Sequence, residues 1–221
     1  PANFAIVGTV NMDESTHGFS RKVLDRAFTI EFSEINLSSW ERRIIDESKS
    51  PIDAWPITAW YPRAIRLGEL TNITDLDRQE IRQVVDALTE INKILIQAQL
   101  QVGFRIRDEL ALFVLHAREM LSSFVDAQGN KVDPLDLAIH MKVLPRIIGG
   151  SSLIRQVVRQ LLAWATEQNL ALESDVQLLV EDWVNTGRPS ALHNAKFPRT
   201  AARLCLMWDR LMNEGFTSFW M

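Results

Sequence analysis

The sequence is poor in cysteine and has no long apolar run. Cys205 is the one cysteine among 221 residues, so no internal disulfide can form, which is typical of proteins in a reducing cytoplasm. No stretch approaches the roughly 18–20 apolar residues of a membrane-spanning helix, and no secretory leader is evident. We therefore expect a cytoplasmic protein in which Cys205, set among apolar neighbours, is a buried structural thiol.

Motifs of several catalytic and metal sites are also missing. The four histidines show no metal-ligand spacing, and neither H-E-x-x-H nor C-x-x-C occurs. No glycine-rich loop ends in Gly-Lys-Ser or Gly-Lys-Thr, and no apolar run ends in Asp-Glu in the manner of a Mg²⁺-binding strand. We expect no metal site in the chain and no nucleotide hydrolysis by the chain alone.

The charge balance is slightly acidic. A net charge of −4 and a pI near 5.6 argue against a broadly basic nucleic-acid-binding surface. However, no acidic residue occurs between Asp136 and Glu167, where two i,i+4 pairs of cations lie. These pairs are a candidate face for nucleic acid or an acidic partner subunit, with an ordinary solvated surface as the alternative: Lys142 with Arg146, and Arg155 with Arg159.

Apolar periodicity predicts a mainly α-helical chain with two short strands near its start. The strands are expected at residues 4–10 and 28–32, with apolar side chains of the second strand facing inward. A helix around 40–48 and a connector rich in proline and tryptophan follow, and the connector is either a loop pinned to the body or a partner-binding surface. A short helix from Ser20 through Asp25 is expected between the strands, and six or seven helices after them. The helices after the connector are expected to begin near Asp75, Gly103, Asp133, Ser151, Glu173 and Pro198. The last helix is expected to stop at Gly215, and the aromatic tail after it to fold back onto the bundle.

Several segments together resemble a known family. The start of the chain reads Gly8-Thr9-Val10-Asn11, Asp13-Glu14, Ser20-Arg21-Lys22-Val23-Leu24-Asp25-Arg26-Ala27 and Ile30-Glu31-Phe32. These residues resemble the sensor 1 region of AAA+ nucleotidases, specifically the McrB-like branch associated with methyl-dependent restriction. Looser similarities lie at Gly103–Leu110, which looks like the start of a sensor 2 helix, and at Lys142–Arg146 and Gly215–Trp220.

The resemblance implies a role for each matching residue. Asn11 corresponds to sensor 1 and Asp13 to an acidic residue that positions water or an arginine. Arg26 corresponds to an arginine finger acting in trans, for which a planar, permanently charged guanidinium is suited. Either Arg105 or Arg107 corresponds to sensor 2. The alternatives are a strand-end cap for Asn11, a surface ion pair for Arg26 and solvated charges for Arg105 and Arg107.

The resemblance also implies a domain organisation. Residues 1–35 are expected to be the end of an AAA+ α/β core, 36–74 a helix and connector, and 75–221 a helical lid with a C-terminal extension. Because the chain starts at Pro1, almost inside a predicted strand, we expect a C-terminal fragment of a longer motor subunit.

The whole motor is expected to bind ATP or GTP with Mg²⁺ and to assemble with neighbouring copies of itself. It would drive a nuclease subunit on DNA, in a restriction or related defence complex. The alternative is a non-enzymatic helical adaptor that binds a partner protein. A native reading frame that continues upstream into a Gly-Lys-Thr loop would favour the motor.

Overall fold

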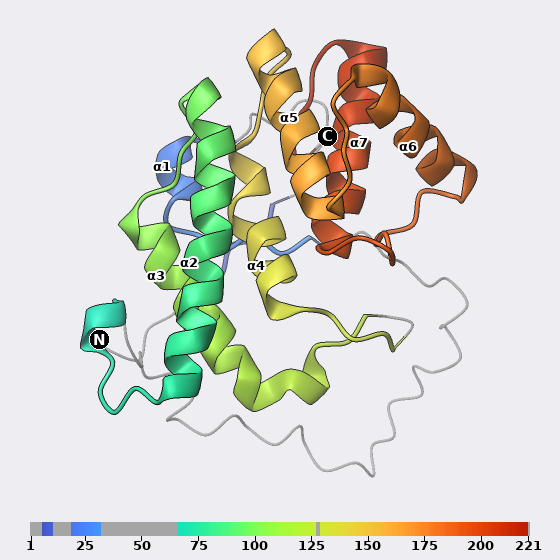
Figure 1. Cartoon of the computed structure of the whole chain (residues 1–221). Helices are drawn as coiled ribbons and strands as arrows, with labels where there is room; N and C mark the ends of the chain where they lie inside the picture. The colour runs from blue at the N-terminus through green and yellow to red at the C-terminus, as the bar shows by residue number, and fades with distance from the viewer. Residues whose placement is uncertain (1–5, 11–18, 32–65, 127–128, 221) are drawn as a thin grey trace.

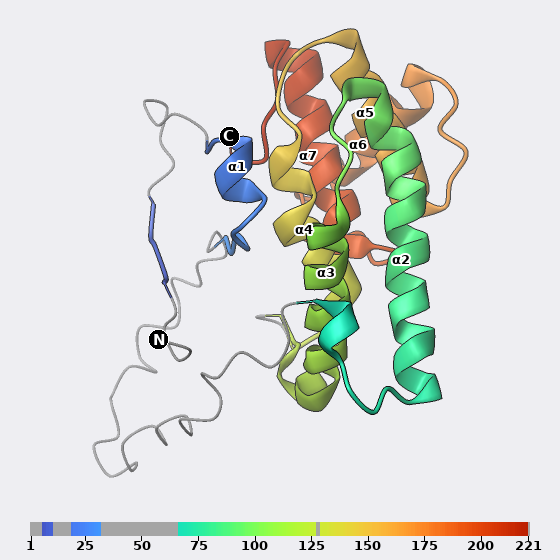
Figure 2. The same ribbon diagram turned by 90° about the vertical axis from the view of Figure 1, so that its left-hand side faces the viewer.

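The computed structural model describes residues 6–10, 19–31, 66–126 and 129–220. Within these ranges the chain is mainly α-helical, as the sequence predicts, and the major helices lie side by side in one bundle (Figures 1 and 2). The α-helices are α1 (Arg21–Leu24), α2 (Asp75–Leu95), α3 (Phe104–Ala117), α4 (Pro134–Lys142), α5 (Ser152–Thr166), α6 (Glu173–Asn185) and α7 (Pro198–Glu214). Short 3₁₀ segments are η3 (Leu67–Glu69), η4 (Ile96–Ala98), η5 (Arg118–Ser123) and η6 (Leu144–Arg146).

Local capping explains where several helices begin and end. The hydroxyl of Thr74 accepts a hydrogen bond from the Asp77 amide, and the Asp77 carboxylate accepts one from the Thr74 amide, which forms a capping box on α2. The side chains of Asp133 and Ser151 also act as N-caps, because each accepts a hydrogen bond from a backbone amide in the first turn of α4 and α5, respectively. Gly215 ends α7 in the left-handed conformation, with φ of 73°.

The core lies where α5 packs against α7, α2 against α3, and α4 between α3 and α7. Trp208 of α7 is fully buried at its centre, next to Cys205, and burial raises the pKa of the Cys205 thiol to about 12. A thiol with so high a pKa is protonated at neutral pH, so the expectation of a structural cysteine is confirmed.

The aromatic tail returns to the body as predicted. The amide of Gly149 donates to the carbonyl of Thr217 at 2.9 Å, and the reciprocal bond measures 3.1 Å. This pairing brings Gly150 so close to α7 that an added Cβ would lie 2.0 Å from the carbonyl oxygen of Gly215. Phe219 is thereby buried, and its ring lies 5.0 Å from that of His140.

The two strands expected near the start are not seen among the described residues. Residues 6–10 and 27–31 form no strand, and Ile6 and Val7 are more than four-fifths exposed. A strand is stabilised by backbone hydrogen bonds to a neighbouring strand. Among the described residues, the backbone of 28–31 makes one such bond to another element, from the Thr29 amide to the carbonyl of Met141 at 3.3 Å.

The expected inward side of 28–31 is also wrong, because Thr29 and Glu31 face the bundle while Ile30 is 67% exposed. The predicted helix at 40–48 and most of the connector lie outside the described residues. No helix in the described ranges has the length and apolar character needed to cross a bilayer.

Candidate functional site

The segment 19–31 lies along the helical bundle and is attached to it through cations of α4 and η6. The ammonium group of Lys142 donates to the carbonyl of Ala27 at 2.9 Å and pairs with the carboxylate of Glu109 at 2.6 Å. It also lies 4.9 Å from the centre of the Phe28 ring. Arg146 pairs with Asp25 and donates to the carbonyl of Gln101 at 3.4 Å. Both cations are buried, with residue exposures of 1% and 8%.

Lys142 and Arg146, one of the two pairs named as a candidate face for nucleic acid or an acidic partner, are therefore buried and contact segment 19–31 of the chain itself. The two cations on α5 also have intramolecular partners. Arg159 donates to the carbonyls of Leu170 and Ala171 at 2.8 and 2.5 Å, and Arg155 lies 3.8 Å from the carboxylate of Glu173. Spacing of i,i+4 indicates a shared helix face but not whether that face meets solvent or protein.

A cationic cleft of about 420 Å³ opens where the N-terminal segment meets the start of α3. Lys22 of α1 and Arg26 line one side, and Arg105 in the first turn of α3 lines the other, so the structure brings the expected finger and one sensor 2 candidate together. Among the described residues, the side chains of Lys22, Arg26 and Arg105 have no ion-pair partner, whereas the one carboxylate of the lining, Asp25, is paired with Arg146. The described part of this cleft is therefore positively charged.

The backbone adds to this positive charge. Gly103 is the N-cap of α3 and supplies no side-chain acceptor for the first amides of a 14-residue helix. No acidic residue lies in the first turn. Because a helix carries a partial positive charge at its N-terminus, the uncapped start of α3 and the three cations favour the same kind of ligand, an anion such as phosphate.

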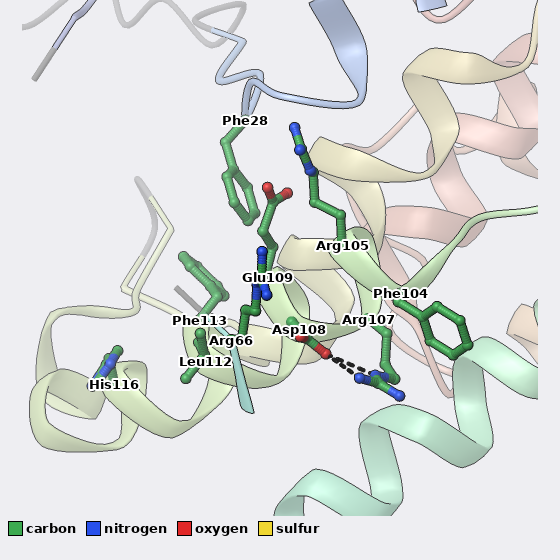
Figure 3. Close-up of a pocket in the computed structure, with 10 residues that line it drawn as sticks. All are labelled: Phe28, Arg66, Phe104, Arg105, Arg107, Asp108, Glu109, Leu112, Phe113 and His116. Carbon is green, nitrogen blue, oxygen red and sulfur yellow. Dashed lines mark hydrogen bonds and ion pairs between the residues drawn. The ribbon is translucent and has the colours of Figure 1, made fainter. Parts of the chain in front are cut away.

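Arg105 and Arg107 lie in different environments (Figure 3). Arg105 extends toward the blue N-terminal ribbon, whereas Arg107 turns back onto its own helix. The guanidinium of Arg107 bonds the carboxylate of Asp108 through Nε at 2.7 Å and Nη2 at 2.6 Å, and it lies 4.9 Å from the centre of the Phe104 ring. Arg105 is thus the one of the two that lines the cationic cleft.

A second hollow adjoins the first on the outer side of α3 and has a volume of about 940 Å³. Figure 3 shows its lining, in which the Phe28 and Phe113 rings stack with centres 5.6 Å apart. Phe104 at its far end is 79% exposed. Arg105 lines both hollows, so they form neighbouring parts of one site.

Two of the expected site residues, Asn11 and Asp13, lie outside the described residues. Sequence reasoning assigned no role to Lys22, although it stands in the motif Ser20–Ala27 beside Arg26. It also missed Gln101, whose position at the cleft follows from packing and not from any motif. No group of histidine, cysteine and acidic residues suited to a metal occurs within the described ranges.

A family model described as a domain of unknown function (DUF8727) matches residues 60–216. The chain belongs to this family. The DUF8727 match includes Arg105, Arg107, Lys142 and Arg146, and it begins after the segment that carries Lys22 and Arg26. No curated protein and no solved structure matches the chain.

Proposed function

We propose that the chain is the C-terminal part of a McrB-like AAA+ motor subunit, in which the helical body acts as the lid over a bound nucleotide. The cationic cleft at the start of α3 supports this proposal, because it joins an uncapped helix N-terminus to the cations Lys22 and Arg105. Phosphate groups are recognised by such a combination of backbone amides and cationic side chains.

In this proposal Arg105 is sensor 2 and contacts the phosphates of the nucleotide. Its side chain lines the cleft and has no ion-pair partner among the described residues, whereas the charge of Arg107 is already compensated by Asp108. Arg26 is the arginine finger, which acts on the nucleotide of a neighbouring subunit. Asn11 is sensor 1, and Asp13 orients water or an arginine near it.

The remaining parts of the motor lie outside this sequence. The phosphate loop and the acidic residues that hold Mg²⁺ belong to the rest of the subunit, which binds ATP or GTP. The partners are neighbouring copies of the subunit, a nuclease subunit and DNA, in a restriction or related defence complex. The chain by itself is not catalytic in this proposal.

The test is nucleotide hydrolysis by the full-length subunit carrying Arg105→Gln. We expect kcat to fall by about 10²-fold or more, because electrostatic stabilisation of the transferring phosphoryl group is lost. Nucleotide binding, measured with a fluorescent analogue, is expected to weaken much less. Arg82→Gln is the matched control, because Arg82 is an exposed arginine on α2 away from both hollows. Unchanged turnover in Arg105→Gln would contradict the sensor assignment, and a full-length protein without nucleotide hydrolysis would leave the helical adaptor as the better account.

A further inference from the structure

A separate cleft of about 740 Å³ lies between α4, α7 and the loop that follows α6. It shares no lining residue with the cationic cleft at α3. Most of its lining falls within the DUF8727 match. Its described lining contains four arginines but only two carboxylates, Glu31 and Asp126, so the cleft carries an excess of positive charge although the whole chain is acidic.

Three of the four arginines come from one side of α7. Arg199, Arg203 and Arg210 are separated by steps of four and seven residues, which place them on one face of a helix. At 1.5 Å per residue they span about 16 Å along the helix axis. Apolar side chains of Ala202 and Leu206 lie between them on the same wall.

These arginines differ in what they already contact. Arg203 pairs with Glu31, donates to the carbonyl of Phe219 at 3.1 Å, and lies 4.6 Å from the centre of the Phe219 ring. Among the described residues, the side chains of Arg199 and Arg210 take part in no hydrogen bond or ion pair. Nη1 of Arg210 is moreover buried without an acceptor. Because a buried donor without an acceptor is costly, a ligand acceptor placed at this nitrogen would bind favourably.

The fourth arginine, Arg188, stands at the rim and is already paired with Asp209 at 2.9 Å. The positive charges of the α7 arginines nevertheless affect a titratable side chain of the cleft, His140. Burial, together with Arg203 and Arg199, lowers the pKa of His140 in the lining to about 3. His140 is therefore neutral at physiological pH, and it contributes no charge of its own.

We propose that this cleft binds an extended acidic segment of a partner protein. The chain itself already shows this mode, because the non-helical residues Ile30 and Glu31 line the cleft and the carboxylate of Glu31 pairs with Arg203. In an extended peptide, alternate side chains point the same way about every 7 Å, so acidic residues four positions apart, separated by about 14 Å, can approach both Arg199 and Arg210 at the two ends of the row of arginines on α7. Apolar side chains between them would meet Ala202, Leu206 and Met141.

Other anions fit less well. A single phosphate cannot reach arginines spread over about 16 Å of helix. A nucleic acid strand would leave the apolar half of the lining without partners. A carboxylate-bearing peptide satisfies both the charged and the apolar parts of the cleft.

The test uses the 221-residue chain and a fluorescein-labelled nonapeptide in which glutamate alternates with leucine and valine. Fluorescence anisotropy is expected to show saturable binding that weakens as salt is raised. The double variant Arg199→Gln/Arg210→Gln is expected to raise the Kd about tenfold or more, and Arg82→Gln is expected to leave it unchanged. Since neither replaced side chain makes a hydrogen bond or an ion pair among the described residues, the double variant is expected to fold, and a cooperative thermal unfolding transition checks this.

Three outcomes would overturn the proposal. The first is no binding of the glutamate peptide at millimolar concentration. The second is equal binding of the same peptide with glutamine in place of glutamate, or an unchanged Kd in the double variant. The third is tighter binding of a 12-residue oligothymidylate at the same arginines, which would assign the cleft to nucleic acid. None of these results bears on Arg105 or on nucleotide hydrolysis, so the two proposals fail independently.

Discussion

Lys142 is a fully buried ammonium group whose charge is compensated from three sides. It contacts the carboxylate of Glu109, the carbonyl of Ala27 and the face of the Phe28 ring. Arg146, one turn later along the chain, repeats the arrangement with Asp25 and the carbonyl of Gln101. A buried charge persists only where such partners are supplied, so these two residues fasten segment 19–31 to the bundle.

Replacing Lys142 by methionine should test this role. The change leaves the Ala27 carbonyl and the Glu109 carboxylate without their cation, and we expect a loss of about 3 kcal/mol in the free energy of unfolding. Glu109 is 25% exposed, and its partial hydration keeps the loss from being larger. Urea denaturation of the 221-residue chain measures it, with Lys93→Met on the exposed side of α2 as control. A loss below about 1 kcal/mol would mean that Lys142 is not needed to hold the segment.

The spacing of Lys142 and Arg146 predicts a shared helix face, but α4 ends at Lys142 and Arg146 lies in η6, and the sequence could not show that both cations would be buried. Burial is decided by residues more than 100 positions away, such as Ala27, and no local pattern carries that information. The same limit applied to Arg105 and Arg107, which stand two positions apart in one motif. The packing of segment 19–31 builds the cleft that Arg105 lines, and the charge of Arg107 is compensated by the neighbouring Asp108.

At the scale of elements, the N-terminus of α2 is held by Thr74, Asp77 and Arg118. The Asp77 carboxylate accepts hydrogen bonds from the Thr74 hydroxyl at 2.7 Å and the Thr74 amide at 2.8 Å, and it pairs with Arg118 of η5. The hydrogen bonds from Thr74 and Arg118 lower the pKa of Asp77 to about 2. The Asp77 carboxylate thus takes part both in the N-terminal cap of α2 and in the ion pair that links α2 to η5.

This lowered pKa predicts a dependence of stability on pH. The contribution of Asp77 is fully present above its ordinary pKa of 3.8 and is lost as the pH falls from there toward 2. In Asp77→Asn the thermal midpoint should be lower at pH 6, and its fall between pH 4 and 2 should be shallower than in the parent. Circular dichroism melts across that range measure it. Parallel pH profiles of the two proteins would contradict the assignment, and Asp75→Asn, which lies exposed in the same first turn, serves as control.

Elements whose ends depend on local chemistry were predicted well. α6 covers residues 173–185 as expected, and α4 and α7 begin at Pro134 and Pro198, each the first residue of its helix. Caps and turns involve neighbours in sequence, so they can be read there. The strands at 4–10 and 28–32 failed as a prediction because apolar runs indicate only a tendency, and a strand needs a partner that the described residues do not supply.

At the scale of the whole molecule, segment 19–31 crosses both clefts. Arg26 lines the cationic cleft at the start of α3. Five residues later, Glu31 lines the separate cleft between α4, α7 and the loop after α6, where it pairs with Arg203. An acidic peptide that competes with Glu31 for Arg203 would therefore act on the same segment that carries Arg26.

The assignment of Arg26 and Arg105 to different nucleotides predicts complementation between subunits. Arg26 and Arg105 line the same cleft of one chain. In the proposal, however, Arg105 contacts the nucleotide of its own subunit, and Arg26 acts on the nucleotide of a neighbouring subunit. Full-length Arg26→Ala and Arg105→Ala subunits should each be nearly inactive in nucleotide hydrolysis. Mixed in equal amounts and allowed to reassemble, they should recover about a quarter of the parental turnover, because in a ring with head-to-tail interfaces about that share of sites receives both arginines.

Mixing each variant with itself under the same conditions provides the control for reassembly, and parental subunits taken through the same exchange give the reference rate. Turnover that stays at the level of the single variants would contradict action in trans. It would instead assign Arg26 and Arg105 to the same nucleotide, in the cleft of the chain that carries them both.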